Sequence, residues 1–304
     1  MTGAINPTSE VFLNNVQQIE NRISTAERQL SSGLRVNVAS DAPDQISSIL
    51  QLRAQISGVQ QTQENLSTVT PQVDSGENAL QQAIQVLDTA TSLAAEAAGS
   101  TSSASQRLDV VPQVQGILQQ LVSLSQTAVN GRYIFSGDQN DQPAYTLNAA
   151  GDGVQQMIQP GPPGQIQDAN GIPFTIGMTA QQIFDDGPAG NPAADNVFAA
   201  VSGLLSALQN NDSAGIQTAL GNIQAASAHL NDASSFYGAA LNNITAANNA
   251  AGTTLTQLQQ QLSNAQDCDA MQASLDLQSA LTGEQAAMAA QAQFKPQSLF
   301  SYLG

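Results

Sequence analysis

The sequence has few of the residues from which reactive sites are built. Tryptophan is absent, and the chain contains one histidine, one cysteine and one lysine, at His229, Cys268 and Lys295. A single cysteine excludes an intramolecular disulfide, and a histidine metal pair or a catalytic triad could be built around the one histidine only with distant partners that the sequence does not identify. We therefore expect His229 and Cys268 to be structural. The sequence predicts no catalytic residues, no cofactor and no metal site.

The one acidic pair that suggests a cation site is Asp185-Asp186. It precedes Gly187-Pro188, which is typical of a solvated turn. A good calcium site needs six or more oxygen ligands, so we expect no metal here.

Charge is scarce and strongly acidic. Only 10% of the residues are charged, the formal net charge is −17 at pH 7, and no basic residue lies between Arg132 and Lys295. Such a surface repels phosphates and anionic lipids, so neither nucleic acid nor a membrane is an expected partner. Residues 1–12 lack the basic start and the apolar run of a secretory signal peptide, and we find no stretch long enough to span a membrane.

Aromatic residues make up only 4% of the chain, and the composition favours helix-on-helix seams over a large globular core. Apolar residues recur at helical spacing at both ends of the chain, which places each set on one stripe of a helix. The front seam is Val16, Ile19, Ile23, Ala26 and Leu30, and the back seam runs through Leu241, Ile244, Asn248, Ala251, Leu255, Leu258, Leu262 and Ala265. A seven-residue series lies between them: Leu52, Val59, Leu66, Val73, Leu80, Leu87 and Ala94.

These patterns predict long helices at both ends of the chain. We expect helices over 11–30, from a cap at Ser40 or Asp41 to about 98, and over 108–129, 197–209, 213–262 and 264–292, with a break near Gly238 and with Cys268 inside the last helix. The fold class predicted is mainly α, with long terminal helices in coiled-coil or helical-bundle layers.

The middle of the chain has a different composition. Residues 137–195 hold nine of the 23 glycines and seven of the 12 prolines, and every charged residue there is an aspartate. Short apolar runs at 145–147 and 173–176 predict strands in small hairpins. We expect a small inserted domain, either β-rich or irregular.

Two stretches resemble the bacterial flagellin superfamily. Residues 29–37, QLSSGLRVN, continuing into SDAPD at 40–44, are similar to its N-terminal segment, and NGRYIFSG at 130–137 is similar to a signature of its hook-associated branch. The tail SLFSYL at 298–303 is similar to the ending of that branch. The arginines that flagellins carry in the second long helix and in the return helix are missing from 87–96 and 238–242, which puts the salt bridges of those arginines between subunits in doubt.

The resemblance implies a structural subunit that joins hook to filament, with a filament-forming flagellin as the alternative. Residues 1–40 and 266–304 would form an inner coiled-coil domain, 41–136 and 196–265 a helical-bundle domain, and 137–195 an outward-facing insert. It also implies export through the flagellar type III apparatus to an extracellular flagellum. The partners would be copies of the chain in a ring or tube, a neighbouring hook-associated protein, flagellin, and a cytoplasmic export chaperone on the C-terminal helix. The seams alone also permit a coiled-coil adaptor that does not polymerise.

The seams predict where such a subunit would assemble. The predicted interface consists of Val16, Ile19, Ile23, Leu30, Arg35, Leu258, Leu262, Leu275, Leu299, Phe300 and Leu303, with a hinge at Gly33 and family signature residues at Asn130, Gly131, Arg132, Tyr133 and Phe135. Arg35 could pair with Asp41 or Asp44 or with a neighbouring subunit, although a simple exposed arginine is the default interpretation. Because one apolar residue in three or four offsets little of the cost of ordering a helix, about 1–2 kcal/mol per residue, we expect residues 1–35 and 270–304 to order only on assembly.

Overall fold

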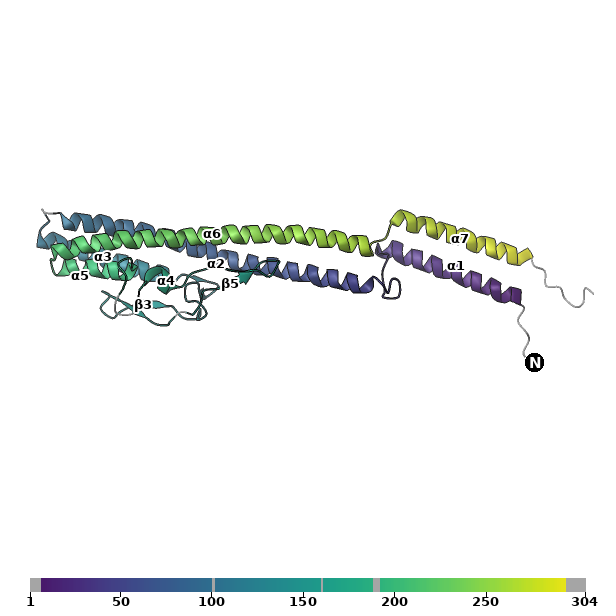
Figure 1. Cartoon of the computed structure of the whole chain (residues 1–304), viewed down its shortest axis with the longest axis horizontal. Helices are drawn as coiled ribbons and strands as arrows, with labels where there is room; N and C mark the ends of the chain where they lie inside the picture. The colour runs from purple at the N-terminus through teal and green to yellow at the C-terminus, as the bar shows by residue number, and fades with distance from the viewer. Residues whose placement is uncertain (1–6, 100–101, 160, 188–191, 294–304) are drawn as a thin grey trace, which may run out of the picture. The chain divides into compact units, whose positions relative to one another are not determined.

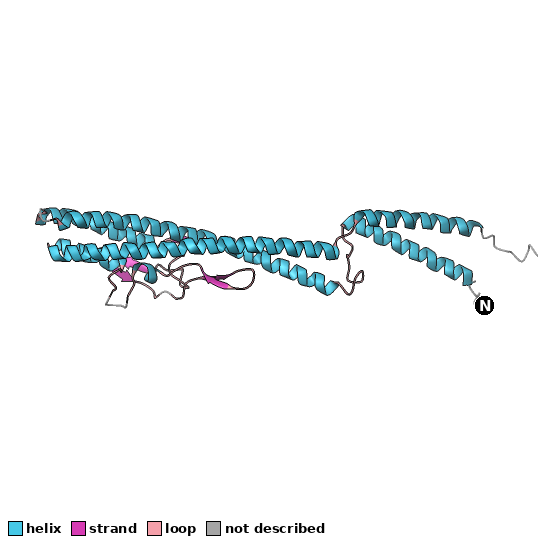
Figure 2. Ribbon diagram, turned by 45° about the horizontal axis from the view of Figure 1, so that its top comes forward, coloured by secondary structure: helices cyan, strands magenta, loops and turns pink. Residues whose placement is uncertain are grey.

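The computed structural model describes residues 7–99, 102–159, 161–187 and 192–293. Long helices dominate it, and its short strands are confined to one region (Figures 1 and 2). The helices are α1 (Pro7–Ser32), α2 (Ile46–Ala98), α3 (Ala104–Ser125), α4 (Ala180–Phe184), α5 (Val197–Gln209), α6 (Ser213–Gln266) and α7 (Ala270–Gln293). The predicted fold class is confirmed.

The strands form three separate antiparallel hairpins. They pair as β1 (Ala128–Val129) with β2 (Arg132–Tyr133), β3 (Tyr145–Leu147) with β4 (Val154–Gln156), and β5 (Gln165–Gln167) with β6 (Pro173–Thr175). The runs predicted at 145–147 and 173–176 are therefore strands, as expected. Two-stranded hairpins are marginally stable by themselves, so this region depends on its packing against helices.

The chain divides into two compact units. We call residues 1–57 and 255–304 the terminal unit, and residues 58–254 the central unit. Both α2 and α6 run through the boundary between the units. The division into an inner domain, a bundle and an outer insert concerns the assembled state and stays a prediction.

The core of the central unit lies along the predicted seven-residue series. Six members of the series are buried: Val59, Leu66, Val73, Leu80, Leu87 and Ala94. They pack into one cluster with buried residues of α3, α5 and α6, including Leu121, Leu204 and Leu230. Within this unit α2 and α6 run side by side, and the strands lie on one side of the helices (Figures 1 and 2).

The terminal unit has a much thinner core. Its helices α1 and α7 lie side by side (Figures 1 and 2), and the residues buried on them are Ala26, Ala273 and Ala280. These small side chains allow the two helices to approach closely. A second small cluster consists of Val36, Ala42 and Ile49, with Leu262 and other partly buried residues packed against it.

The start of α2 differs from the prediction. The helix begins at Ile46 rather than next to a cap at Ser40 or Asp41. The Asp41 carboxylate instead accepts hydrogen bonds from the backbone N–H groups of Asn37 and Val38, each at 2.9 Å. Asp and Asn side chains compete for backbone donors in this way, so Asp41 stabilises the turn before the helix.

The predicted break near Gly238 is also wrong, because α6 continues without interruption from Ser213 to Gln266. Tyr237 and Ala240 on either side of the glycine are buried. The stabilisation from burying these side chains exceeds the free-energy cost of one glycine in a helix, which is about 1 kcal/mol.

Cys268 lies between α6 and α7 rather than inside a helix, and it is partly buried. The next helix has a cap that the sequence reading missed. The Asp269 carboxylate accepts hydrogen bonds from the N–H groups of Met271 and Gln272 at 3.0 and 3.1 Å. The signal was present as Asp269 followed three residues later by Gln272, which is a typical helix start.

Candidate assembly interface

The apolar residues predicted for the front of the interface lie along α1. Val16, Ile19, Ile23 and Leu30 are all partly buried. The Ile19 side chain reaches α7, since its Cδ1 lies 3.8 Å from the position that a Cβ on Gly283 would occupy. The structure therefore brings the front seam against the last described helix of the chain.

The C-terminal part of the predicted interface is only partly brought together. Leu258 and Leu262 near the end of α6 are partly buried. Leu275 is 56% exposed, and it lies on the side of α7 away from Ala273 and Leu277, because two positions along a helix correspond to roughly 200°. Leu299, Phe300 and Leu303 lie outside the described residues.

Exposed apolar side chains gather in the terminal unit. Of eleven large apolar residues that are exposed in the described part of the chain, eight belong to this unit: Val11, Leu13, Val38, Leu50, Met271, Leu275, Leu281 and Met288. Where such residues form a contiguous apolar surface, they favour association with another chain. The pair formed by α1 and α7 thus keeps apolar side chains on its outside as well as inside.

Residues 33–36 and 265–268 are joined by backbone hydrogen bonds, and we call them the clasp. The N–H groups of Arg35 and Val36 donate to the Gln266 carbonyl at 2.7 and 3.3 Å, and the Cys268 N–H donates to the Gly33 carbonyl at 2.9 Å. The clasp ties the segment after α1 to the end of α6.

Arg35 strengthens the clasp through its side chain. Its guanidinium donates to the Ala265 carbonyl at 2.6 Å and to Gln45 Oε1 at 2.7 Å. It forms no ion pair with Asp41 or Asp44, which was one of the alternatives that the sequence left open. The Val38 and Asn37 N–H groups hold the pKa of the Asp41 carboxyl below its usual value. A cation at the C-terminal carbonyls of α6 is favoured by the helix dipole.

Gly33 closes α1 in a left-handed conformation. Its φ is +71°, and its N–H donates to the Gln29 carbonyl at 2.9 Å. This is the usual geometry of a glycine after a helix C-terminus. Because its carbonyl is also held by Cys268, Gly33 is fixed at both sides in this state. Its role as a hinge stays a prediction.

The family signature forms a tight hairpin at the end of α3. Asn130 and Gly131 have φ values of +53° and +77°, and they connect Val129 to its strand partner Arg132. Positive φ at both central positions is the two-residue turn that Asn-Gly favours, because its twist matches that of the flanking strands. The signature therefore sets the direction in which the chain leaves the helices.

Phe135 of the same signature anchors this hairpin in the core. It is fully buried and contacts the rings of Phe184 and Tyr237 edge to face, with centroids 6.0 and 6.2 Å away. Its carbonyl accepts a hydrogen bond from the Ala180 N–H at 2.7 Å. One aromatic side chain thus connects the hairpin to α4 and α6.

Tyr237 crosses from α6 toward α2 beside this cluster. A Cβ on Gly76 would overlap the Tyr237 ring, so the glycine is needed for space. The Tyr237 hydroxyl accepts a hydrogen bond from the Met178 N–H at 3.1 Å. Burial raises the pKa of Tyr237 to about 12, so the phenol is neutral at physiological pH.

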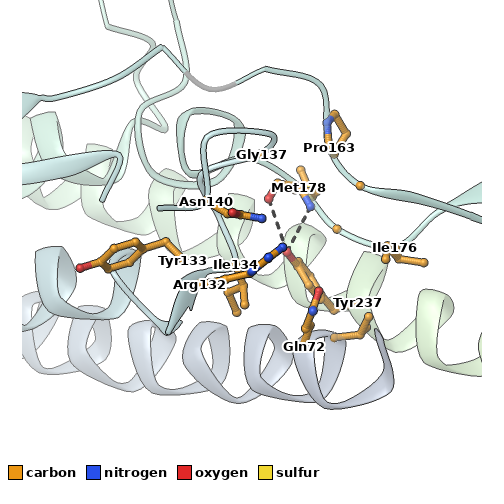
Figure 3. A pocket seen from close by; sticks show the side chains of 13 residues that line it. Gln72, Arg132, Tyr133, Ile134, Gly137, Asn140, Pro163, Ile176, Met178 and Tyr237 are labelled. Atoms are coloured by element: carbon orange, nitrogen blue, oxygen red, sulfur yellow. Dashed lines mark hydrogen bonds between the residues drawn. The ribbon is translucent and has the colours of Figure 1, made fainter. Parts of the chain in front are cut away.

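Arg132 and Tyr133 line a cavity of about 240 Å³ beside the hairpin (Figure 3). The walls come from α2, the signature, the loop that precedes α4, and Tyr237 of α6. Figure 3 shows Arg132 among Gln72, Asn140 and Tyr237. This cavity lies entirely within the central unit.

The residues that could have carried chemistry have structural contacts. A His229 ring nitrogen lies 2.8 Å from the Gln182 carbonyl, and the other lies 3.8 Å from the Asp195 carboxylate. The Asp185 carboxylate accepts hydrogen bonds from Tyr145 at 2.9 Å and from Asn196 at 2.8 Å. Burial, followed by the interaction with Asp185, raises the pKa of Tyr145.

Arg107 is an important residue that sequence reasoning missed. Its buried guanidinium donates to the Ala97 carbonyl at 3.0 Å, to Asn211 Oδ1 at 2.7 Å and to Ser213 Oγ at 3.4 Å. It therefore joins the end of α2, the start of α3 and the start of α6. No local pattern marks an arginine for this role, because Asn211 and Ser213 are distant from it in sequence.

Comparison with known protein families places the two ends of the chain in one group. Residues 6–140 match the bacterial flagellin N-terminal helical region, and residues 220–303 match the bacterial flagellin C-terminal helical region. The chain belongs to the bacterial flagellin family. This is a family of structural flagellar proteins, not of enzymes.

Two curated relatives show how far the similarity extends. Flagellar hook-associated protein 3 of Escherichia coli is 27% identical over 221 residues, which cover 66% of this chain and 66% of that protein. Flagellin B of Helicobacter pylori is 28% identical over 116 residues, which cover 38% of this chain and 23% of that protein. The chain thus spans just under two thirds of the first relative and about a quarter of the second.

A solved structure of a putative flagellar hook-associated protein from Vibrio parahaemolyticus has the same fold. The TM-score is 0.64 at 20% identity, and the match covers 75% of this chain and 100% of that chain. Within the ranges that the structure describes, no helix combines the length and apolar character needed to cross a membrane.

Proposed function

We propose that this member of the flagellin family is a structural subunit of the bacterial flagellum that joins hook to filament. The observation that carries the proposal is the α1–α7 pair, which leaves large apolar side chains exposed on a helical layer next to the clasp. Such a layer favours association with other helices. The similarity to the hook-associated protein of Escherichia coli, over about twice the length of the flagellin B match, supports the junction over the filament.

In this function the predicted interface residues of α1, α6 and α7 contact other subunits. Burial of apolar surface contributes about 25 cal/mol per Å², so exposed residues such as Leu275 and Met271 would stabilise the assembly much more than the monomer. The partners would be further copies of this chain, a neighbouring hook-associated protein and flagellin. An export chaperone would cover the C-terminal helix before export through the type III apparatus to the extracellular flagellum.

Electron microscopy of the purified chain distinguishes the junction from its rival. The chain would be added to isolated hooks and, separately, be induced to polymerise by salt. A junction subunit binds hook ends and permits further growth only when flagellin is added. Long filaments of this chain alone would instead establish a filament flagellin. A chain that binds neither itself nor hooks would be the non-polymerising adaptor.

A pair of matched variants tests the interface. Leu275 of α7 and Leu108 of α3 are similarly exposed, at 56% and 52%. We expect Leu275→Ser to reduce binding to hook ends while Leu108→Ser leaves it unchanged, with both monomers as stable as the wild type. Equal binding by the two variants would remove Leu275 from the interface.

A further inference from the structure

The central unit has an unusual charge distribution. It contains 15 of the 24 acidic residues and only two of the seven basic residues, Arg107 and Arg132, which leaves a formal charge of −13. Arg107 is buried and uses its guanidinium to join helix ends. Among the described residues, the Arg132 side chain is exposed and makes no hydrogen bond or ion pair. Its positive charge is therefore unmatched inside a strongly acidic unit.

The cavity beside Arg132 contains no carboxylate. Its lining carries uncharged polar groups, including those of Gln72, Asn140 and Tyr237, and Arg132 supplies the one formal charge (Figure 3). In a chain with more than three acidic residues for each basic one, an arginine-lined cavity without an acid is notable. The cavity is electrostatically complementary to an anion.

The backbone at Arg132 is held in place before any ligand arrives. It follows the Asn130-Gly131 turn directly and pairs with Val129 across the hairpin. The next residue, Tyr133, donates its N–H to the Asn140 carbonyl at 2.8 Å. A fixed backbone on both sides lowers the ordering cost of binding, which is the advantage of a preorganised site.

We propose that this cavity receives an aspartate or glutamate side chain from a second copy of the chain. A volume of about 240 Å³ lies below the roughly 300–1,000 Å³ of sites for drug-sized ligands, and it suits a single side chain. The guanidinium presents a planar fork of donors that matches a carboxylate. The partner carboxylate is abundant, because each further copy presents the same acidic central unit.

The inference rests on the proposed function, because assembly is what brings central units together. A single exposed ion pair contributes little to stability. The same pair repeated at each contact of a ring acts at a high effective concentration and adds to the apolar contacts of the terminal unit. The Arg132 contact would then also set which copies fit side by side, since acidic surfaces without it repel each other.

The test compares two variants that each lower the net charge by one. Arg132→Gln removes the proposed contact, and Gln155→Glu adds a negative charge at an exposed position of β4. Self-association of the full chain would be followed by sedimentation velocity over a range of concentrations, and binding to hook ends by electron microscopy. We expect Arg132→Gln to raise the concentration for half-assembly roughly tenfold, Arg132→Lys to have a smaller effect, and Gln155→Glu to have little effect.

The possible outcomes distinguish a failure of the Arg132 contact from a failure of the proposed junction function. Unchanged association of Arg132→Gln would overturn the inference and leave the proposed function intact. Equal losses in Arg132→Gln and Gln155→Glu would show general repulsion, and would also overturn it. Arg132-dependent association of a chain that fails to bind hooks would refute the function while supporting the contact. A wild-type chain that does not associate with itself at all, in solution or on hooks, would refute the contact.

A charge-reversal series identifies the source of the carboxylate. Arg132→Asp would be combined, one at a time, with arginine at each exposed acid of the central unit. Recovery of association in one combination would support the inference and identify the partner residue. Failure of every combination, together with saturable binding of N-acetylaspartate amide to wild type but not to Arg132→Gln, would assign the cavity to a free small acid and overturn the inference.

Discussion

The terminal and central units are built from the same kind of helix but differ in what surrounds it. In the central unit the apolar stripe of α2 is covered by side chains from α3, α5 and α6 in one continuous cluster. In the terminal unit the buried residues of α1 and α7 are all alanines, the larger residues of the front seam are only partly buried, and the other cluster has a core of three buried residues. The difference shows that one sequence pattern gives a self-sufficient core only where further helices close over it.

The two units also differ in net charge. The terminal unit holds five of the seven basic residues and nine acidic residues, for a formal charge of −4, against −13 in the central unit. With its smaller net charge, the terminal unit repels copies of itself less than the central unit does. The larger acidic excess therefore belongs to the unit that completes its own core, and the smaller one to the unit with exposed apolar side chains.

Amide exchange should show the largest contrast between the units. We expect the amides of α1 and α7 in the monomer to exchange with free energies near zero, while those around Leu87 and Leu121 approach the global stability, on the order of 5–15 kcal/mol. On assembly the terminal amides should become protected. Equal protection of Ile23 in monomer and polymer would contradict the comparison.

Truncation of one apolar side chain in each unit should give a smaller but clear difference. Phe135→Ala in the central core should cost about 3–5 kcal/mol of unfolding free energy, because it leaves a cavity between Phe184 and Tyr237. Ile23→Ala on α1 should cost under about 1 kcal/mol in the monomer, because its helix contributes little buried surface. Urea unfolding followed by circular dichroism measures both. Similar losses would mean that the units are equally well packed.

Two helical glycines of the central unit differ in the space around them, and alanine at the two positions should have opposite effects on stability. Gly76→Ala should cost about 1–3 kcal/mol, because the new methyl group overlaps Tyr237. Gly238→Ala, which meets nothing within 4 Å, should instead stabilise by up to about 1 kcal/mol. Thermal unfolding of the two variants would show the opposite signs. A stabilising Gly76→Ala would mean that the Tyr237 ring can move away freely.

The smallest effect is expected at the clasp. Arg35→Ala removes donors from the Ala265 carbonyl and Gln45, and it should cost about 0.5–1 kcal/mol. The loss should appear as faster exchange of the Cys268 amide with no change at Leu121. Arg28→Ala is the control, because it removes an arginine whose side chain donates a hydrogen bond to Thr25 of α1 and not to the clasp. A change at Leu121 would show that the clasp supports both units.

The sequence predicted the helices and the covered stripe of the central unit well. Its apolar residues recur every seven positions, and this spacing can be recognised although many of the residues between them are polar. It failed where the low helix propensity of one residue was offset by the packing of its neighbours. At Gly238 the burial of Tyr237 and Ala240 keeps α6 continuous. It also failed at Asp41 and Cys268, where local capping decided the outcome. The role of Arg107 could not have been found, because two of its three partners, Asn211 and Ser213, lie more than 100 residues away.

For the candidate site, the sequence analysis identified Asn130 and Gly131 as part of the family signature and did not predict the turn that they form. An Asn-Gly pair specifies a tight hairpin by itself, whereas the burial of Phe135 and the cavity beside Arg132 depend on α2, α4 and α6. The spacing of apolar residues could show which of them share one face of a helix. Leu275 shows the limit of this approach, because its face of α7 is opposite to the one that packs on α1.

The clasp has a consequence for the order in which the chain can fold. It joins residues about 230 positions apart, so α1 is synthesised long before its partners exist. Closing so long a loop is entropically costly, although the cost grows only slowly with length. Folding of the central unit first would shorten the loop, since Gly252 of α6 comes to lie close to Gln63 of α2. Helices α1 and α7 would then meet last, and the proposed assembly surface would be completed only in a finished molecule.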